Sequence, residues 1–221
     1  MSESNNQPGG KLTLWGGGTV RTFRAHWMLH ELGLDYEPHL IGSRTGETQS
    51  DAFRRLNPKE KIPVLVDGAL VLSESAAIIT YLADRYGAST GLTPEPRTEA
   101  RAHYDEWTSF ILMELDAHTL YVMRRHRDLA DLYGEAPAAI DAAIAGFQKQ
   151  VAVADHALAE RDYLIGEQFT GVDILLTSCL DWAVAYQVGI SERLDAYRKH
   201  HQQRPAYRAS RELNFSVRPG G

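Results

Sequence analysis

Cysteine is almost absent from this sequence, since Cys179 is the single cysteine among 221 residues. No internal disulfide can form, so the fold must rely on packing and hydrogen bonds instead of cross-links. Such sparse use of cysteine is typical of proteins from a reducing compartment. Because Cys179 lies inside an apolar helical pattern, we expect its thiol to be buried in the core.

A positive net charge and long apolar runs are also missing. The formal net charge is −6, and no basic stripe is interleaved with aromatic residues, which argues against a nucleic acid or an anionic membrane as partner. No apolar run reaches the roughly 18 residues that span a bilayer. Residues 1–10 are polar and lack the apolar segment of a secretory signal. We therefore expect a disordered tail over residues 1–10 and a cytoplasmic location.

Residues 11–87 alternate between strand-like and helical patterns, which predicts a mixed α/β domain. Helical spacing over residues 20–32 ends at Gly33, which is placed as the glycine that terminates a helix. The remaining patterns predict a strand over 12–15, a strand over 35–40, a loop with a helical piece, strands over 64–66 and 70–72 around the hairpin signal Asp67-Gly68, and a helix over 74–86.

The second part of the chain, residues 98–221, is predicted to be entirely helical. Residues 88–97 before it are rich in turn formers and include two prolines, which is typical of a linker. Thr170 and Asp173 have the spacing of a capping box at a helix start. Helical periodicity extends over residues 98–126, 136–160, 170–187 and 191–212.

Pro63 stands directly before the strand predicted from residue 64. A proline cannot donate a hydrogen bond to a sheet, so the entry to a strand suits it. A cis bond between Ile62 and Pro63 would turn the backbone outward and leave the N–H and C=O of Ile62 free for an extended peptide. An ordinary trans proline is the alternative, because only about 5–6% of such bonds are cis.

Ser73, Glu74 and Ser75 form a polar entry to the next predicted helix. The free N–H groups and the positive dipole end of a helix favour a carboxylate there. Glu74 adds a negative group for an ammonium, and the Ser75 hydroxyl adds a donor, so this set matches the head of an α-amino acid. Simple capping of the helix by Ser73 is the alternative.

The three glycines 16–18 lead directly into a helix that begins near Thr19. A dinucleotide-binding fingerprint requires a third glycine where Arg21 stands, and the Gly-Lys-Ser/Thr of a P-loop is missing. Nucleotide binding is therefore not expected at this turn. Thr19 places a hydroxyl at the start of the helix instead.

The order and spacing of these features resemble the cytosolic glutathione transferase family, of the bacterial type with a serine- or threonine-like active site. The resemblance extends over nearly all of residues 11–212. It implies an α/β thioredoxin-like domain that binds glutathione, followed by an all-α domain. The residues that carry it are the run from Arg24 to Glu37, Asn57-Pro58, Lys61-Ile62-Pro63-Val64-Leu65, Glu74-Ser75 with Ile78, and Arg204-Pro205-Ala206.

The resemblance also assigns roles in glutathione binding. In the family, the proline that matches Pro63 is cis, and the residue that matches Ile62 pairs with the cysteinyl backbone of glutathione. The residues that match Glu74 and Ser75 hold the γ-glutamyl end. Lys61 matches a polar or basic position near the glycyl carboxylate.

The residue that contacts the glutathione sulfur is harder to assign. Family members place a tyrosine, serine or cysteine near the end of the first strand, but residues 14–16 contain no tyrosine and residues 11–87 no cysteine. Counting back from Gly33 matches Thr19 to the hydroxyl of the serine-type classes. A shift of one residue would put Val20 there and a longer shift Thr22, and a backbone N–H is a further alternative.

The resemblance implies an enzyme, a glutathione S-transferase, that conjugates glutathione as co-substrate to small hydrophobic electrophiles in detoxification, without a metal. A homodimer is expected from the same resemblance. Tyr104 and Trp107 are candidates for lining the electrophile pocket. The alternatives are glutathione-dependent reduction of disulfides or peroxides at the same site, and a non-catalytic binding or scaffold protein.

Two further patterns receive structural interpretations. His26 and His30 have the spacing of a zinc-binding helix, but Trp27 occupies the position of the general-base glutamate, so a packed helix is favoured over a metal site. The basic run over residues 124–127 is short and is interpreted as a solvated helix end.

Overall fold

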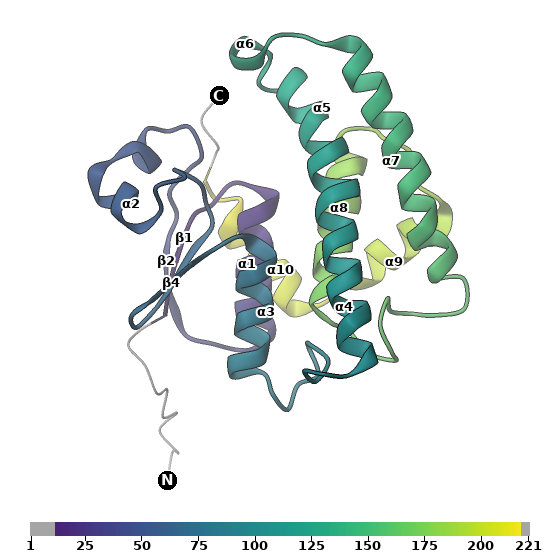
Figure 1. Cartoon of the computed structure of the whole chain (residues 1–221), viewed down its shortest axis with the longest axis horizontal. Helices are drawn as coiled ribbons and strands as arrows, with labels where there is room; N and C mark the ends of the chain where they lie inside the picture. Colours follow the sequence, from purple (N-terminus) through teal and green to yellow (C-terminus); the bar gives the residue numbers. More distant parts are fainter. Residues whose placement is uncertain (1–11, 218–221) are drawn as a thin grey trace.

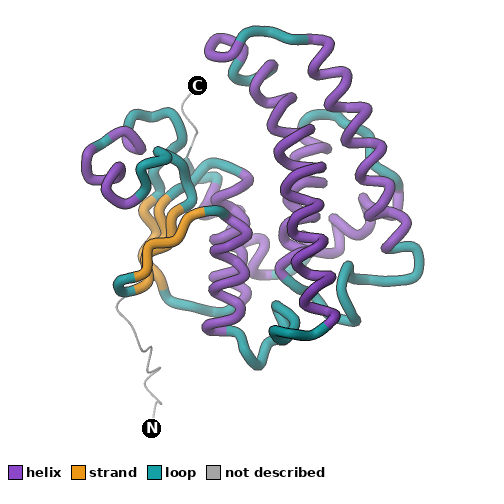
Figure 2. Tube along the Cα trace, in the orientation of Figure 1, coloured by secondary structure: helices purple, strands orange, loops and turns teal. Residues whose placement is uncertain are grey.

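The structure, a computed structural model, describes residues 12–217, and the tail expected over residues 1–10 lies outside the described residues. A sheet with its helices forms one half of the molecule, and a group of longer helices forms the other (Figures 1 and 2). The first half contains β1 (Leu12–Trp15), α1 (Val20–Glu31), β2 (Tyr36–His39), the short helix η1 (Glu47–Gln49), α2 (Asp51–Leu56), β3 (Val64–Asp67), β4 (Leu70–Ser73) and α3 (Ser75–Tyr86). The second half contains α4 (Glu99–Phe110), η2 (Ile111–Leu120), α5 (Tyr121–His126), α6 (Ala130–Tyr133), α7 (Pro137–Ala157), α8 (Gly171–Ala185), α9 (Glu192–Gln202) and α10 (Pro205–Asn214).

The four strands lie in the order β2-β1-β3-β4. Strand β1 is parallel to β2 and antiparallel to β3, and β3 forms an antiparallel hairpin with β4. Asp67 pairs with Leu70, so the two-residue turn is Gly68-Ala69 and not the predicted Asp67-Gly68. Gly68 has a φ of 57°, a conformation that favours glycine. The predicted order of strands and helices in this half is confirmed.

Helix α1 ends at the glycine that the sequence indicates. Gly33 has a φ of 60°, its N–H donates to the carbonyl of His30 (3.2 Å), and the N–H of Leu34 donates to the carbonyl of Leu29 (3.1 Å). These are the two bonds of a Schellman motif. The end of the helix is thus encoded locally.

The helical half departs from the predicted pattern in two places. The stretch predicted over residues 98–126 consists of α4, η2 and α5 in succession, and η2 is wound as a π-helix. The stretch predicted over residues 191–212 is two helices, because Pro205 has no N–H to continue α9 and instead begins α10.

Among residues 12–217, no helix is both long and apolar enough to cross a membrane. The division into domains at residues 87 and 98 stays a prediction.

Helix α1 joins the two halves, because it packs against α3 on one side and against α8 and α10 on the other. Trp27 of α1 is fully buried and its ring contacts Phe169 and Tyr207. Arg204 stacks on Phe169 at 3.9 Å and donates from Nε to Glu31 at 2.6 Å. The halves therefore share one continuous core, and the site lies where they meet.

Candidate active site

The loop between β1 and α1 passes very close to the loop that carries Ile62. Gly16 has a φ of 124°, and a Cβ at that position would lie 2.7 Å from the Cβ of Ile62 and 2.6 Å from Cγ2 of Thr22. Both the backbone conformation and the lack of space therefore require glycine here. The close approach brings Ile62 beside the first turn of α1.

Thr19 is the N-cap of α1 and forms a reciprocal capping box with Thr22. Thr19 Oγ1 accepts from the N–H of Thr22 (3.1 Å), and the N–H of Thr19 donates to Thr22 Oγ1 (3.1 Å). Thr19 is 8% exposed and lines a cavity together with Val20. Thr22 is fully buried beneath it, so its hydroxyl lies too deep to contact a ligand.

The end of the last helix anchors this loop. The side-chain amide of Asn214 donates from Nδ2 to the carbonyl of Thr19 (3.1 Å) and accepts at Oδ1 from the Thr22 hydroxyl (2.6 Å). The Asn214 carbonyl also accepts from the N–H of Gly18 (2.7 Å). Asn214 is fully buried. Sequence reasoning missed this contact, because Asn214 and Thr19 lie 195 positions apart.

His26 holds the same loop by hydrogen bonds, although its spacing to His30 is that of a zinc-binding helix. Its Nε2 lies 3.0 Å from the carbonyl of Gly16, and its Nδ1 lies 2.7 Å from the Tyr36 hydroxyl. Burial lowers the pKa of His26 to about 4. The ring is therefore neutral, donates to Gly16 and accepts from Tyr36. Within residues 12–217, no three His, Cys, Asp or Glu side chains are grouped as metal ligands.

The loop before β3 has the backbone that the sequence features predict. The Ile62–Pro63 bond is cis. The buried side chain of Asn57 donates to the carbonyl of Lys61 (2.7 Å) and accepts from the N–H of Lys59 (3.2 Å), which holds the loop in place. The N–H and C=O of Ile62 have no hydrogen-bond partner among residues 12–217, so both remain available to a bound peptide.

Glu74 and Ser75 begin α3 on the far side of Ile62. The Glu74 carboxylate is 73% exposed and pairs with the Lys59 ammonium at 2.6 Å, a partner that sequence reasoning did not identify. Ser75 is buried, and its Oγ lies 3.5 Å from Nη1 of Arg24. A guanidinium thus lies directly behind the hydroxyl that is expected to bind a carboxylate.

Arg24 belongs to a buried group of charges that the sequence did not indicate. Asp116 of η2 lies 2.5 Å from Arg21 Nη2 and 2.8 Å from Arg24 Nη1. Burial acts to raise the pKa of the Asp116 carboxyl, but the two guanidinium groups outweigh it and hold the pKa below its usual value. Arg24 also donates to Ser178 Oγ (2.7 Å) and lies 3.2 Å from Cys179 Sγ. The group therefore links α1 to η2 and α8.

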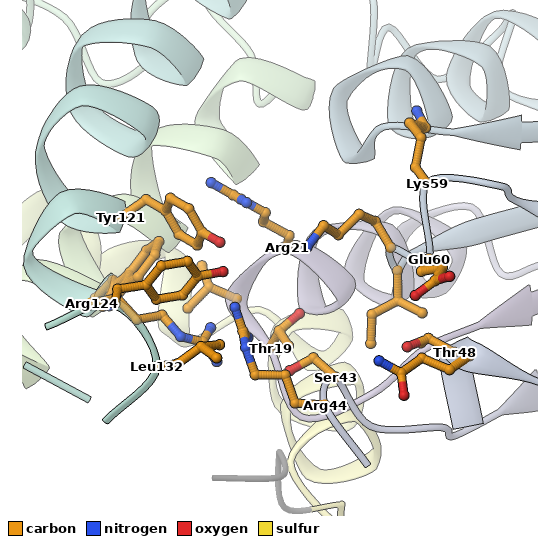
Figure 3. Close-up of a pocket in the computed structure, with 16 residues that line it drawn as sticks. Thr19, Arg21, Ser43, Arg44, Thr48, Lys59, Glu60, Tyr121, Arg124 and Leu132 are labelled. Atoms are coloured by element: carbon orange, nitrogen blue, oxygen red, sulfur yellow. The ribbon is translucent and has the colours of Figure 1, made fainter. Parts of the chain in front are cut away.

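Two adjoining cavities connect these residues. One, of about 450 Å³, lies beside Glu74 and Ser75, and the other, of about 260 Å³, lies beside Thr19. Figure 3 shows the second, with Thr19 and side chains from both halves of the molecule around it. The cavities adjoin each other, since both are lined by Arg21, Lys61, Ile62 and Tyr121. The structure therefore brings all six predicted glutathione-binding and sulfur-contacting residues to these two cavities: Thr19, Lys61, Ile62, Pro63, Glu74 and Ser75.

The two residues expected to line the electrophile pocket line neither of these cavities. Tyr104 is 0% exposed, and its hydroxyl lies 3.1 Å from that of Thr80, so it belongs to the core and the prediction that it lines a pocket is wrong. Trp107 packs edge-on against Phe110 and lines neither of the two cavities. The aromatic residues on the cavity wall near Thr19 are instead Tyr121, Tyr133 and Trp182.

The basic run over residues 124–127 and the single cysteine lie in different surroundings. The run lies at the end of α5 as expected, and Arg124 in its last turn also lines the cavity beside Thr19. Arg127 stacks over Tyr186 at 5.0 Å. Cys179 is fully buried as expected, and burial raises the pKa of its thiol to about 12, so it supplies no thiolate.

Sequence comparisons identify both halves. A model of the glutathione S-transferase N-terminal domain matches residues 10–84, and a model of the C-terminal domain matches residues 110–205. Glutathione S-transferase 3 of Zea mays is 33% identical over 156 residues, which is 68% of this chain and 68% of the maize protein. Glutathione S-transferase theta-1 of Rattus norvegicus is 32% identical over 149 residues, 64% of this chain, and the match spans 60% of the rat protein.

Structural comparisons agree with these matches. A theta class glutathione S-transferase from Xanthomonas axonopodis pv. citri with glutathione bound has a TM-score of 0.76 and 30% identity, covering 90% of this chain and 96% of that chain. A glutathione transferase of Phanerochaete chrysosporium shares the fold at a TM-score of 0.84 and 22% identity, over 94% of this chain and 98% of that one. The predicted fold class is thereby confirmed, and this chain belongs to the glutathione S-transferase family.

Proposed function

We propose that this protein binds glutathione in an extended form along the backbone of Ile62 and directs its thiol toward Thr19. The unpaired N–H and C=O of Ile62 match the cysteinyl backbone. Ser75 at the start of α3, with Arg24 behind it, suits the γ-glutamyl carboxylate, and Glu74 suits the ammonium. Lys61 lies between the two cavities and is the proposed partner of the glycyl carboxylate.

The Thr19 hydroxyl is proposed to stabilise the bound thiolate. Its oxygen already accepts from the N–H of Thr22, while the Thr22 hydroxyl donates its own proton to Asn214 Oδ1 (2.6 Å) or to the Thr19 carbonyl (2.8 Å). The Thr19 proton is left to donate, either to Thr22 Oγ1 at 2.9 Å or into the cavity. A hydrogen bond to a charged group contributes about 1.5–3 kcal/mol, against about 1 kcal/mol for a neutral one. A thiolate is therefore the preferred acceptor.

The reaction proposed is conjugation to a small electrophile. The thiol proton passes to solvent, the thiolate sulfur forms a bond to the electrophilic carbon, and the leaving group departs with its electron pair. The protein contributes thiolate stabilisation and the positioning of both reactants. The observation that carries this proposal is the position of the Thr19 hydroxyl on the wall of the cavity that Ile62 and Lys61 also line.

Glutathione-dependent reduction of a disulfide is the second candidate. It needs two glutathiones and no protein thiol: the first thiolate displaces one thiol of the acceptor disulfide and forms a mixed disulfide, and the second displaces the other thiol and forms glutathione disulfide. The buried position of Cys179 favours a route without a protein–glutathione mixed disulfide. Rates with a disulfide and with an aryl halide as acceptor, measured on the same preparation, distinguish the two activities.

Replacing Glu74 with glutamine is expected to weaken glutathione binding by up to about fivefold, because the carboxylate is 73% exposed, an exposed ion pair contributes up to about 1 kcal/mol, and about 1.4 kcal/mol corresponds to a factor of ten. Calorimetric titration with glutathione measures the Kd. Glu47→Gln alters a glutamate of the same half whose carboxylate bonds Thr45, and its Kd should stay at the wild-type value. Equal affinities of the Glu74→Gln variant and the wild type would contradict the proposed binding mode.

Replacing Asn214 with leucine is expected to lower kcat several-fold without an equal rise in the KM for glutathione. The substitution removes the side-chain amide that ties Thr22 and Thr19 to the end of α10, so the loop that carries the Thr19 hydroxyl loses part of its anchoring. The pKa of the bound thiol, followed by thiolate absorbance, should rise. Ser210→Ala removes another buried hydroxyl of α10, which donates to Tyr207, and serves as the matched control. An unchanged thiol pKa in Asn214→Leu would show that Asn214 only stabilises the fold.

Detoxification, a homodimer and a cytoplasmic location stay predictions of the family resemblance. The β4 edge of the sheet carries the exposed apolar side chains Leu70 and Val71, which is compatible with a contact to a second copy. Light scattering in solution measures the oligomeric state, and a monomeric mass would contradict the homodimer.

A further inference from the structure

The cavity beside Thr19 is strongly cationic. Five of its lining residues are basic and one, Glu60, is acidic, and Glu60 is paired with Arg54 at 2.8 Å. Two of the cations are also paired within the protein, Arg21 with Asp116 and Lys59 with Glu74. The other three, Arg44, Lys61 and Arg124, have no ion pair with a carboxylate among residues 12–217.

One glutathione does not use all of this charge. On the proposed function, its γ-glutamyl carboxylate lies at Ser75 in the neighbouring cavity and its glycyl carboxylate at Lys61. Arg44, from the loop after β2, and Arg124, from α5, then remain around the Thr19 side of the cavity (Figure 3). Each unpaired guanidinium presents a planar set of donors that matches a carboxylate.

The cations are set among aromatic and apolar side chains. Tyr121, Leu132, Tyr133 and Trp182 line the same cavity. Arg44 lies at the Tyr133 hydroxyl, and this hydrogen bond, with the positive charges of Arg44, Lys61 and Arg125, lowers the pKa of Tyr133. The positive field of the cavity therefore already acts on one of its own side chains. Aromatic faces next to guanidinium groups suit a flat ring that carries a negative substituent.

We infer that the acceptor substrate of this enzyme is an electrophile with a planar apolar body and a carboxylate, which Arg124, with Arg44 beside it, binds next to the sulfur. This inference rests on the proposed function and names its substrate class. It adds a charged group to the small hydrophobic electrophile that the family resemblance implies.

A pair of acceptors that differ only in charge tests the inference. 4-Chloro-3-nitrobenzoate and its neutral amide, 4-chloro-3-nitrobenzamide, react in the same way: the glutathione sulfur bonds to the ring carbon that bears chlorine, the carbon–chlorine bond breaks, and chloride leaves. The wild type is expected to have a higher kcat/KM for the carboxylate than for the amide, after each is divided by its uncatalysed rate. Added salt should reduce this preference, because it screens the attraction.

Arg124→Met should lower the carboxylate-to-amide ratio about tenfold or more, which is the loss expected for one charge-assisted contact. Arg127→Met is the matched control, because it removes the same charge from the same run but lies outside the cavity, and its ratio should equal that of the wild type. A wild-type preference for the amide would overturn the inference. An equal loss on both acceptors in Arg124→Met would also overturn it. A rise in the KM for glutathione in that variant would overturn it as well, and would place Arg124 at the glycyl carboxylate. In each of these cases turnover of the amide by the wild type would leave the proposed function intact, whereas no turnover of either acceptor would contradict the proposed function itself.

Discussion

Replacing Thr19 with valine is expected to raise the pKa of bound glutathione thiol by about one to two units. The basis is the loss of one hydrogen bond to a charged group, about 1.5–3 kcal/mol, where each pKa unit corresponds to about 1.36 kcal/mol. At a pH below the thiol pKa of the wild-type complex, each unit lowers the thiolate fraction tenfold, so kcat there should fall about 10- to 100-fold. Thiolate absorbance as a function of pH, with glutathione saturating, measures the shift.

Two variants separate this chemical role from the capping role of Thr19. Thr19→Ser keeps the hydroxyl and should keep the thiol pKa near the wild-type value. Ser191→Ala removes the N-cap of α9, where Ser191 Oγ accepts from the N–H of Leu194 (3.2 Å), and a lost N-cap costs about 1 kcal/mol of stability. It should lower stability without affecting the thiol. If Thr19→Val binds glutathione with an unchanged thiol pKa, a backbone N–H at the start of α1 is the sulfur donor instead.

Replacing Asp116 with alanine is expected to destabilise the protein by about 3–5 kcal/mol, because removal of one partner from a buried ion pair leaves the other charge uncompensated. Arg24 is 0% and Asp116 2% exposed at the side chain, so water cannot replace the lost carboxylate at Arg24. Denaturant unfolding of the two proteins measures the difference. Asp105→Ala is the matched control, since Asp105 is 64% exposed and lies 3.4 Å from Arg101, and exposed pairs contribute about 0–1 kcal/mol.

The Asp116 contribution has a defined pH dependence. Its folded-state pKa lies below the unfolded value of about 3.9, so its stabilising effect is fully present above about pH 4. The effect is lost as the pH falls through the folded-state pKa, because the unfolded state then binds more protons. The stability gap between the wild type and Asp116→Asn should therefore be constant from about pH 5 to 7 and should narrow below pH 4. A gap that is unchanged at low pH would contradict the ionic interpretation.

Features encoded by short-range spacing could be read from the sequence. Gly33 ends α1 because a left-handed residue is needed for the Schellman bonds, and both bonds involve residues within five positions. Thr19 stands at the start of α1, and Pro63 and Ser75 stand at the starts of β3 and α3. Each of these depends on backbone conformation over a few residues, which the local residue types largely determine.

The missed site features all join distant parts of the chain. Asn214 holds the loop of Thr19, and Asp116 pairs with Arg24. Neither Asn214 nor Asp116 belongs to a recognisable motif in its own segment. Tyr104 and Arg124 show the same limit, since both lie on helical patterns, and one is buried in the core while the other lines the cavity.

The sequence by itself determined the succession of strands and helices, the family, and a hydroxyl at the start of α1. Only the tertiary structure decided that Thr19 reaches the cavity while Thr22 does not, and that Arg124 faces the same space. The physical reason is that periodicity indicates which face of a helix or strand is apolar. The packing of α1, η2, α5 and α10 against one another decides which polar groups are enclosed together.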